Sequence, residues 1–375
     1  MVIYLDNAAT TSVDNQVIET MVRVMQEHSE NPSGLYAPAI ATKQVMDKAR
    51  GIVAKGLGCS SNEVFFTASG TEANNLAILG AARGRKAWGN EIIASGFEHP
   101  SVEECLKALE EEGFLVHRVM PDADGSLSLD GFIEKVNGKT VLVTCMRVNN
   151  EVGTLTDCVA LAKAVKAINR RTAVHVDGVQ AFMKHPTVLD GSIDTFAVSA
   201  HKIHGPKGIG ALYVRKGFHL KTVQYGGGQE QGLRSGTENV PGMAGFAKAV
   251  EIARGDREML SRVEECKKVL LEGLLSIPGC VVNSPEEGSS FLLNVSFPGY
   301  RSETLLHALE QKGVLVSSGS ACGHGERSHT LVAMNLPDAR IDSALRFSFS
   351  SDTRVEEMPQ VVEAMQAVIQ QTERT

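Results

Sequence analysis

The stretch TFAVSAHKIHGPKGIGALYV, residues 195–214, decides the fold. Its apolar run 196–198 predicts a buried strand, the glycines and proline at 205–210 predict a turn, and the run 211–214 predicts another strand. Lys202 stands between the first strand and the turn, where partial burial can lower the pKa of an amine below its free value of about 10.4. The alternative is an ordinary surface lysine beside a loop, and the rest of the chain decides between the two.

Length and composition describe a globular chain with room for two hydrophobic cores. It has 375 residues, 43% of them hydrophobic and 5% aromatic. No segment approaches the roughly 18 uncharged apolar residues of a membrane helix, and the first residues lack the features of a signal peptide. A net charge of -7 disfavours nucleic acid as a direct partner. We therefore expect a cytoplasmic protein with no membrane partner. The charge leaves small acidic or zwitterionic substrates open.

The cysteines indicate reduced thiols, one of them reactive. Seven are scattered without a CxxC pair, so we expect neither disulfides nor a metal site: Cys59, Cys105, Cys145, Cys158, Cys266, Cys280 and Cys322. Cys322 lies in SSGSACGHG, residues 317–325, a run of small turn-forming residues after a predicted strand. His324 could raise its thiolate fraction. A structural loop cysteine is the alternative at this position.

Short apolar runs alternate with helical spacing from residue 64 onward. Because these runs are uniformly apolar, they predict strands of a mainly parallel sheet covered by helices on both faces: 64–66, 91–94, 115–119, 141–144, 174–176 and 196–198. A helix with a strong 3.6-residue period at 259–274 and strands at 291–297 and 314–316 predict a second, smaller domain.

Polar residues follow nearly every predicted strand of the large sheet. Since ligands bind at the carboxyl ends of parallel strands, we expect one cluster at one edge, made from Ser69, Gly70, Thr71, Glu72, Glu98, His99, Asn149, Asn150, Asp177, Gln180, Ser199, His201 and Lys202. The turn at 69–71 opens a helix and suits an anion. Taken alone, Asp177 could cap a helix and His99 could be a core imidazole, but chance would not place the whole set together.

An ordered series of motifs resembles the cysteine desulfurases of the NifS/IscS type, in the class V aminotransferase family. The motifs cover nearly the whole chain: LDNAATT at 5, NPSG at 31, SGTEANN at 69, EHPSV at 98, VNNEVGT at 148, HVDGVQ at 175, SAHKIHGPKGIGALYV at 199, RSGTENV at 234, SSGSAC at 317 and RFSFS at 346. The resemblance implies an α/β protein of pyridoxal-phosphate fold type I. A large domain, 12–255, would hold a mainly parallel seven-stranded sheet, and a smaller α+β domain, 1–11 with 256–375, would carry the cysteine loop.

The resemblance also implies a cofactor, pyridoxal 5'-phosphate, and a role for each matching residue. Lys202 would hold the cofactor as a Schiff base and act as a base on the substrate, and Asp177 would pair with the ring nitrogen. His99 would stack on the ring and, as a catalytic residue, shuttle protons. Gln180 and Asn150 would lie at the ring edge. The phosphate would be held by Gly70, Thr71, Ser199 and His201, with Thr237 of the other subunit, which requires a homodimer. Arg346 would bind the substrate carboxylate, Asn31 would assist it, and Asn150 would also contact the substrate.

The implied reaction converts L-cysteine to L-alanine and leaves the sulfur as a persulfide on Cys322. An acceptor protein would take this sulfur, for example an iron–sulfur scaffold or a tRNA-thiolation protein. The sequence does not choose between iron–sulfur assembly, tRNA thiolation and DNA phosphorothioation. It also leaves open whether Cys322 is a transient iron–sulfur ligand.

Three features depart from the family pattern: Tyr36 after the NPSG turn, Gln231 in the glycine-rich loop, and a shorter loop after Cys322. Two enzymatic alternatives stay open, a selenocysteine lyase and another lyase or aminotransferase with the same cofactor. A non-catalytic sulfur-assembly scaffold is the alternative of another class. A dinucleotide-binding oxidoreductase is disfavoured, because no GxGxxG follows the first strands.

Overall fold

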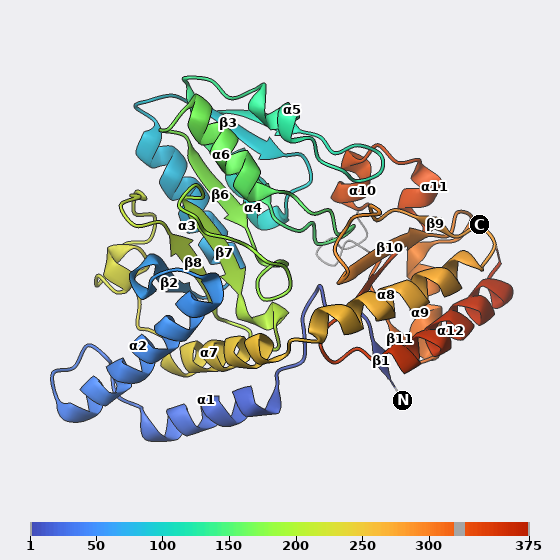
Figure 1. Cartoon of the computed structure of the whole chain (residues 1–375), viewed down its shortest axis with the longest axis horizontal. Coiled ribbons are helices and arrows are strands. Elements are labelled where there is room, and N and C mark those ends of the chain that lie inside the picture. Colours follow the sequence, from blue (N-terminus) through green and yellow to red (C-terminus); the bar gives the residue numbers. More distant parts are fainter. Residues whose placement is uncertain (1, 319–326, 374–375) are drawn as a thin grey trace.

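The computed structural model describes residues 2–318 and 327–373 (Figure 1). The chain forms a larger α/β region and a second region built mainly from its last third. The segment that carries Cys322 and His324 lies outside the described residues.

The larger region is built on a seven-stranded sheet in the order β2-β8-β7-β6-β5-β3-β4. Strand β8 is antiparallel to both of its neighbours, and every other pair is parallel. The predicted mainly parallel seven-stranded sheet is therefore confirmed. Its strands are β2 (Val64–Thr67), β3 (Glu91–Ser95), β4 (Leu115–Val119), β5 (Thr140–Met146), β6 (Ala173–Asp177), β7 (Thr195–Ser199) and β8 (Gly210–Val214).

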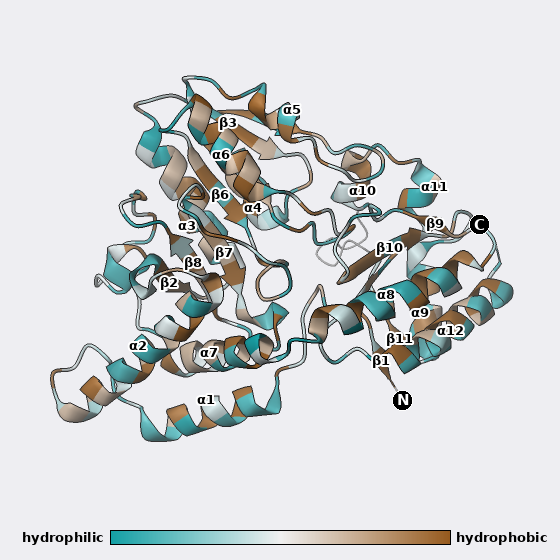
Figure 2. Cartoon of the chain, viewed as in Figure 1, coloured by the Kyte–Doolittle hydropathy of each residue, from teal (hydrophilic) through white to brown (hydrophobic). Residues whose placement is uncertain are grey.

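Helices cover both faces of this sheet, which explains why its strands are uniformly apolar. In β6, Val174 and Val176 join the core on one face and Ala173 joins the core on the other. The first face is covered by α2 (Ala37–Leu57), α5 (Leu129–Ile133), α6 (Cys158–Ile168) and α7 (Val240–Gly255), and the second by α3 (Gly70–Arg85) and α4 (Pro100–Glu111). Helix α1 (Asn15–Glu27) packs on α7. Figure 2 shows apolar strands beneath helices whose outer sides are more polar.

The second region has its own core around an antiparallel sheet. Strand β10 (Leu292–Ser296) lies between β9 (Val281–Val282) and β12 (Ala344–Ser348), while β1 (Ile3–Tyr4) pairs in parallel with β11 (Val314–Leu315). Ile3 and Leu5 pack in this core although they begin the chain. The helices are α8 (Met259–Leu275), α9 (Ser302–Gln311), α10 (His329–Ala333), α11 (Asp338–Ile341) and α12 (Met358–Gln371).

Four short 3-10 helices complete the elements: η1 (Ser61–Glu63), η2 (Ala200–Lys202), η3 (Glu230–Gly232) and η4 (Val355–Glu357). Within the described ranges, no helix has the length and apolar character needed to cross a bilayer.

Candidate active site

A hollow at the carboxyl ends of the large sheet gathers most of the predicted site residues. It lies where β2, β3, β5, β6 and β7 end, since β2 and β7 are both antiparallel to β8 and the others are parallel to β7. The hollow opens to solvent and has a volume of about 220 Å³. Ten predicted residues line it: Ser69, Gly70, Thr71, His99, Asn150, Asp177, Gln180, Ser199, His201 and Lys202.

Lys202 ends the short helix η2, directly after β7. Its Nζ donates to the main-chain oxygens of Ala8 and Ala9, at 2.6 and 2.7 Å. Both the N–H and the hydroxyl of Thr11 donate to the carbonyl oxygen of His201, so the N-terminal turn is tied to the lysine's own segment. The amine is therefore held in the hollow by a part of the chain that lies about 190 residues away.

Asp177, the last residue of β6, is buried in a hydrogen-bond network that no motif indicates. Its Oδ2 accepts from Nδ2 of Asn74 at 2.8 Å, and its Oδ1 accepts from the N–H of Val179 at 2.9 Å. Asn74 also donates to Oγ of Ser101, and its Oδ1 lies 3.0 Å from Nε2 of His175. Burial lowers the pKa of His175 to about 3, so the neutral ring can donate to Asn74. The network fixes the position of the Asp177 carboxylate.

His99 caps helix α4 and presents a neutral ring. Its Nδ1 accepts from the main-chain N–H of Ser101 at 3.1 Å, so the proton of the neutral ring lies on Nε2. Burial lowers the pKa of His99, the nearby Asp177 carboxylate raises it, and Lys202 lowers it. A buried neutral imidazole can stack on a flat ligand and can exchange a proton with it.

The first turn of α3 forms a cradle for an anion. Ser69 caps this helix with its side chain, and Gly70 and Thr71 begin it, where N–H groups have no partner within the helix. A Cβ on Gly70 would lie 2.7 Å from Cγ2 of Val179, so the close approach requires glycine. The hydroxyl of Ser199 is buried in the hollow, and no described residue forms a hydrogen bond with it. These donors fit a phosphate monoester.

Gln180 and His201 supply further polar groups around the hollow. Nε2 of Gln180 donates to the oxygen of Ala8 at 2.8 Å, while its Oε1 is buried with no partner among the described residues. Nδ1 of His201 lies 3.2 Å from the hydroxyl of Thr10. Burial, followed by the charges of Lys202 and two other lysines, lowers the pKa of His201 to about 4, so its ring is neutral. The lysine, the acid, the anion cradle and these unpartnered polar atoms together fit pyridoxal phosphate.

Arg346 lies at the edge of the hollow, on β12 of the second region. Its side chain is 2% exposed; Nη1 donates to the carbonyl oxygen of Asn150 at 3.0 Å, and Nη2 pairs with Oδ1 of Asp6 at 2.8 Å. Its Nε is buried without a partner in the described chain. Arg346 is therefore fixed beside a residue that lines the hollow.

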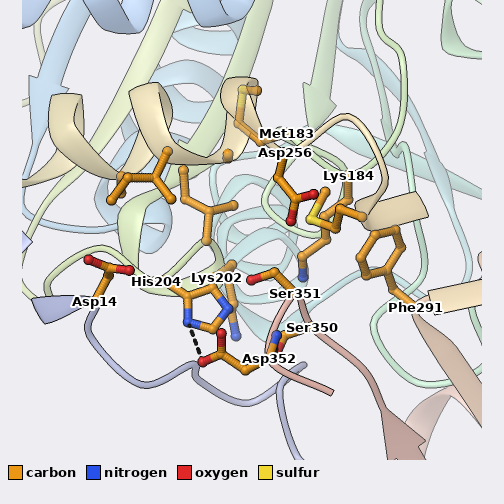
Figure 3. A pocket seen from close by; sticks show the side chains of 15 residues that line it. Asp14, Met183, Lys184, Lys202, His204, Asp256, Phe291, Ser350, Ser351 and Asp352 are labelled. Carbon is orange, nitrogen blue, oxygen red and sulfur yellow. Dashed lines mark hydrogen bonds and ion pairs between the residues drawn. The ribbon is translucent and has the colours of Figure 1, made fainter. Parts of the chain in front are cut away.

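Lys202 also lines a second cavity, of about 50 Å³, which Figure 3 shows. Lys184 lies in this cavity with Phe291 and the 350–352 segment. The two cavities therefore share the side chain of Lys202.

Among the described residues, six predicted for the site do not line the hollow: Asn31, Thr237, Arg346, Glu72, Glu98 and Asn149. Asn31 lies in the exposed loop between α1 and α2, where its Oδ1 accepts from the N–H of Ser33. Thr237 lines a different hollow, beside Phe66 and Glu230. Cys322 lies outside the described residues. Tyr36, one of the departures from the family pattern, is 56% exposed at the start of α2, and Gln231 has a left-handed backbone in η3.

Sequence reasoning missed several residues of the hollow. Asn74 and Ser101 lie within quoted motifs but carry no recognisable signal, and Ala9 contributes only its backbone to the lysine contact. Within residues 2–318 and 327–373, no group of three His, Cys, Asp or Glu side chains could hold a metal ion.

The fold and this hollow define a pyridoxal-phosphate enzyme of fold type I. The chain belongs to the class V aminotransferase family, whose model, "Aminotransferase class-V", matches residues 3–361. The predicted resemblance and the predicted fold class are thereby confirmed.

Cysteine desulfurases are prominent among its relatives. "Cysteine desulfurase IscS" of Clostridium botulinum is 36% identical over 377 aligned positions, which cover 98% of this chain and 94% of the relative. A solved "NifS-like protein" has a TM-score of 0.93 at 37% identity, covering 99% of this chain and 100% of that one. A structure titled "SspA in complex with cysteine" has a TM-score of 0.82 at 32% identity, and the match covers 93% of this chain and 99% of that one.

Proposed function

We propose that this protein is a cysteine desulfurase that converts L-cysteine to L-alanine and transfers the sulfur to Cys322 as a persulfide. The observation that carries the proposal is the hollow in which Lys202 lies with Asp177, His99 and an anion cradle, with Arg346 at its edge. The relatives named cysteine desulfurase and the SspA structure with bound cysteine support the same substrate.

Pyridoxal phosphate would supply an aldehyde and a conjugated ring that accepts electrons from the α-carbon of the substrate. Lys202 would hold the aldehyde carbon and then move the α-proton, while the Asp177 carboxylate would keep the ring nitrogen protonated. His99 would stack on the ring. Gln180 and Asn150 would hydrogen-bond at its edge, and Gly70, Thr71, Ser199 and His201 would bind the phosphate, joined by Thr237 of a second subunit.

Arg346 would bind the substrate carboxylate with two parallel N–H donors, with Asn150 and Asn31 beside it. The Cys322 thiolate would then attack the sulfur of cysteine, forming an S–S bond while the carbon–sulfur bond breaks. The electron pair of that bond stays with carbon, which takes up a proton, so the thiol hydrogen of cysteine is balanced by the new methyl hydrogen of alanine.

The direct test compares Cys322→Ala with wild type. The variant should keep the cofactor absorbance and form no persulfide from cysteine. The control Cys280→Ala should keep both the absorbance and persulfide formation. Lys202→Ala should lose the absorbance that borohydride removes, whereas Lys207→Ala should retain it. Full persulfide transfer by Cys322→Ala would rule out the proposed nucleophile, and greater turnover of selenocysteine or of a keto-acid acceptor would favour the alternative enzymes.

The remaining parts of the proposal concern assembly and location. A homodimer is supported by Thr237, which lies outside the hollow of its own chain and would complete that of the other subunit. Division into domains 12–255 and 1–11 with 256–375 is supported by two cores, one of which unites Ile3 and Leu5 with the last third of the chain. A cytoplasmic location is supported by the free thiols of the described cysteines. The sulfur acceptor would be an iron–sulfur scaffold or a tRNA-thiolation protein.

A further inference from the structure

Glu151 is a buried carboxylate that joins the large region to the start of α10. It follows Asn150, which lines the hollow, and is 8% exposed. Its Oε2 accepts from the hydroxyl of Ser328, and its Oε1 accepts from the hydroxyl of Thr330 at 3.1 Å. Ser328 and Thr330 are themselves 3% and 2% exposed. One side chain therefore holds two hydroxyls that lie 177 and 179 residues farther along the chain.

Ser328 lies close to Cys322 in the sequence, so its contact with Glu151 bears on the cysteine. Ser328 is six residues after Cys322 and caps α10 by accepting from the N–H of Leu331 at 3.1 Å. On the other side, Ser317 is five residues before Cys322 and exchanges two main-chain hydrogen bonds with Arg346, at 2.7 and 3.2 Å. Arg346 in turn donates to the carbonyl oxygen of Asn150. The chain is thus attached beside the hollow both before and after the cysteine.

These attachments limit where the thiol can be. A chain of six residues spans at most about 20 Å even when fully extended. The chain on each side of Cys322 is no longer than that, so a displacement of either attached end changes the volume that the thiol can sample. The later end is held by Glu151, whose carboxylate accepts from both hydroxyls, and by Arg327, which pairs with Asp338 and Asp342 at 2.9 and 2.8 Å.

The side chain of Glu151 is not needed to shape its own turn. Oδ1 of Asn149 accepts from the N–H groups of Glu151 and Val152, and the carbonyl oxygen of Glu151 accepts from Nδ2 of Asn294. The backbone is therefore held by other residues. Burial raises the pKa of Glu151, while Ser328, Arg346 and Thr330 lower it. A carboxylate rather than an amide suits the site, because both facing groups donate and the Ser328 oxygen already accepts from Leu331.

We propose that Glu151 is a positioning residue for sulfur transfer: by holding Ser328 and Thr330, it fixes the end of the Cys322 segment relative to the substrate. This inference rests on the proposed function, since it assigns Cys322 the attack on the substrate sulfur. Glu151 itself touches neither the substrate nor the cofactor in this proposal. Its effect is confined to where Cys322 is delivered.

The test uses Glu151→Gln, which is isosteric, together with Thr330→Val on the other side of the contact. In the complete enzyme, both variants should keep the cofactor absorbance and the spectral change on adding cysteine. Their single-turnover rate of persulfide formation on Cys322 should fall about tenfold or more, as a small misplacement of a reacting group commonly produces. The double variant should be no slower than the slower single variant, because both changes break one contact.

Two further measurements separate positioning from folding and from the proposed function. Alkylation of Cys322 without cysteine, followed by mass spectrometry, should change in rate by at least about threefold in Glu151→Gln relative to wild type, since releasing one attached end changes how a reagent meets the thiol. Ser128→Ala removes the cap of the other five-residue helix, α5, and should change neither rate.

An unchanged persulfide rate and an unchanged alkylation rate in Glu151→Gln would overturn the inference. So would an equal loss of the cysteine-induced spectral change, which would show damage to the whole pocket. A wild-type enzyme that forms no persulfide would instead refute the proposed function, and the alkylation rate would still report whether Glu151 holds the segment.

Discussion

Replacing Lys184 by methionine should stabilise the protein, most strongly at neutral pH. Lys184 is 8% exposed, and its Nζ lies 5.6 Å from the centre of the Phe291 ring, in the cavity that it shares with Lys202 (Figure 3). No carboxylate in the described part of the chain forms an ion pair with it. Burial, followed by the charges of Lys202 and Arg346, lowers the pKa of Lys184 to about 7.

The size and sign of the effect follow from linkage. The lysine has an ordinary pKa of 10.5, so between pH 7 and 10.5 the unfolded chain binds more protons than the folded one, and stability rises with pH across this window. Burial of the Lys184 amine therefore lowers the free energy of unfolding by at most about 4 kcal/mol at pH 7 and by about 2 kcal/mol at pH 9. Methionine keeps most of the methylene packing and removes this cost.

The assay is urea unfolding at fixed protein concentration from pH 7 to 10, on protein freed of cofactor with hydroxylamine. The free energy of unfolding of Lys184→Met should exceed that of wild type by up to about 4 kcal/mol at pH 7, and the difference should shrink as the pH rises. Lys163→Met, which removes a lysine that is 63% exposed, is the control. Parallel curves for wild type and Lys184→Met, or a variant less stable throughout, would refute the reasoning.

Two further substitutions test the hollow. Asn74→Ala removes a donor to Asp177 and should lower the free energy of unfolding in urea by about 1.5–3 kcal/mol. The variant should also lose its cofactor more readily in dialysis. Unchanged cofactor retention would show that the network does not position the Asp177 carboxylate. Arg346→Lys keeps the charge but loses the paired donors, so the KM for cysteine should rise by about tenfold or more in steady-state kinetics. An unchanged KM would assign the substrate carboxylate to another residue.

The sequence predicted the large sheet well because its strands carry one simple signal. Strands β5, β6 and β7 are buried on both faces, and their apolar runs stand out against polar turns. Helix α7 shows where that reasoning fails. Val240, Met243, Phe246 and Val250 have helical spacing, but the glycine and alanine residues between them are buried as well, so the helix lacks the contrast between an apolar and a polar face that marks an amphipathic helix.

The site was predictable in its members but not in its hydrogen bonds. Parallel strands bring their carboxyl ends to one edge, so a polar residue after each strand is enough to predict a cluster. The contact from Asn74 to His175 and that from Glu151 to Ser328 join residues more than 100 positions apart. Such pairs depend on the register of packed elements, which no local pattern encodes.

The N-terminal turn explains how two regions with separate cores share one site. Leu5 packs in the second core, and its carbonyl oxygen accepts from the N–H of Ser348 at 2.7 Å. One residue later Asp6 pairs with Arg346, and two residues beyond that Ala8 accepts from Lys202. The amine and the guanidinium are therefore held by adjacent parts of one turn. A shift of the second core therefore moves Arg346, and the main-chain oxygens that hold the Lys202 amine, relative to the large sheet.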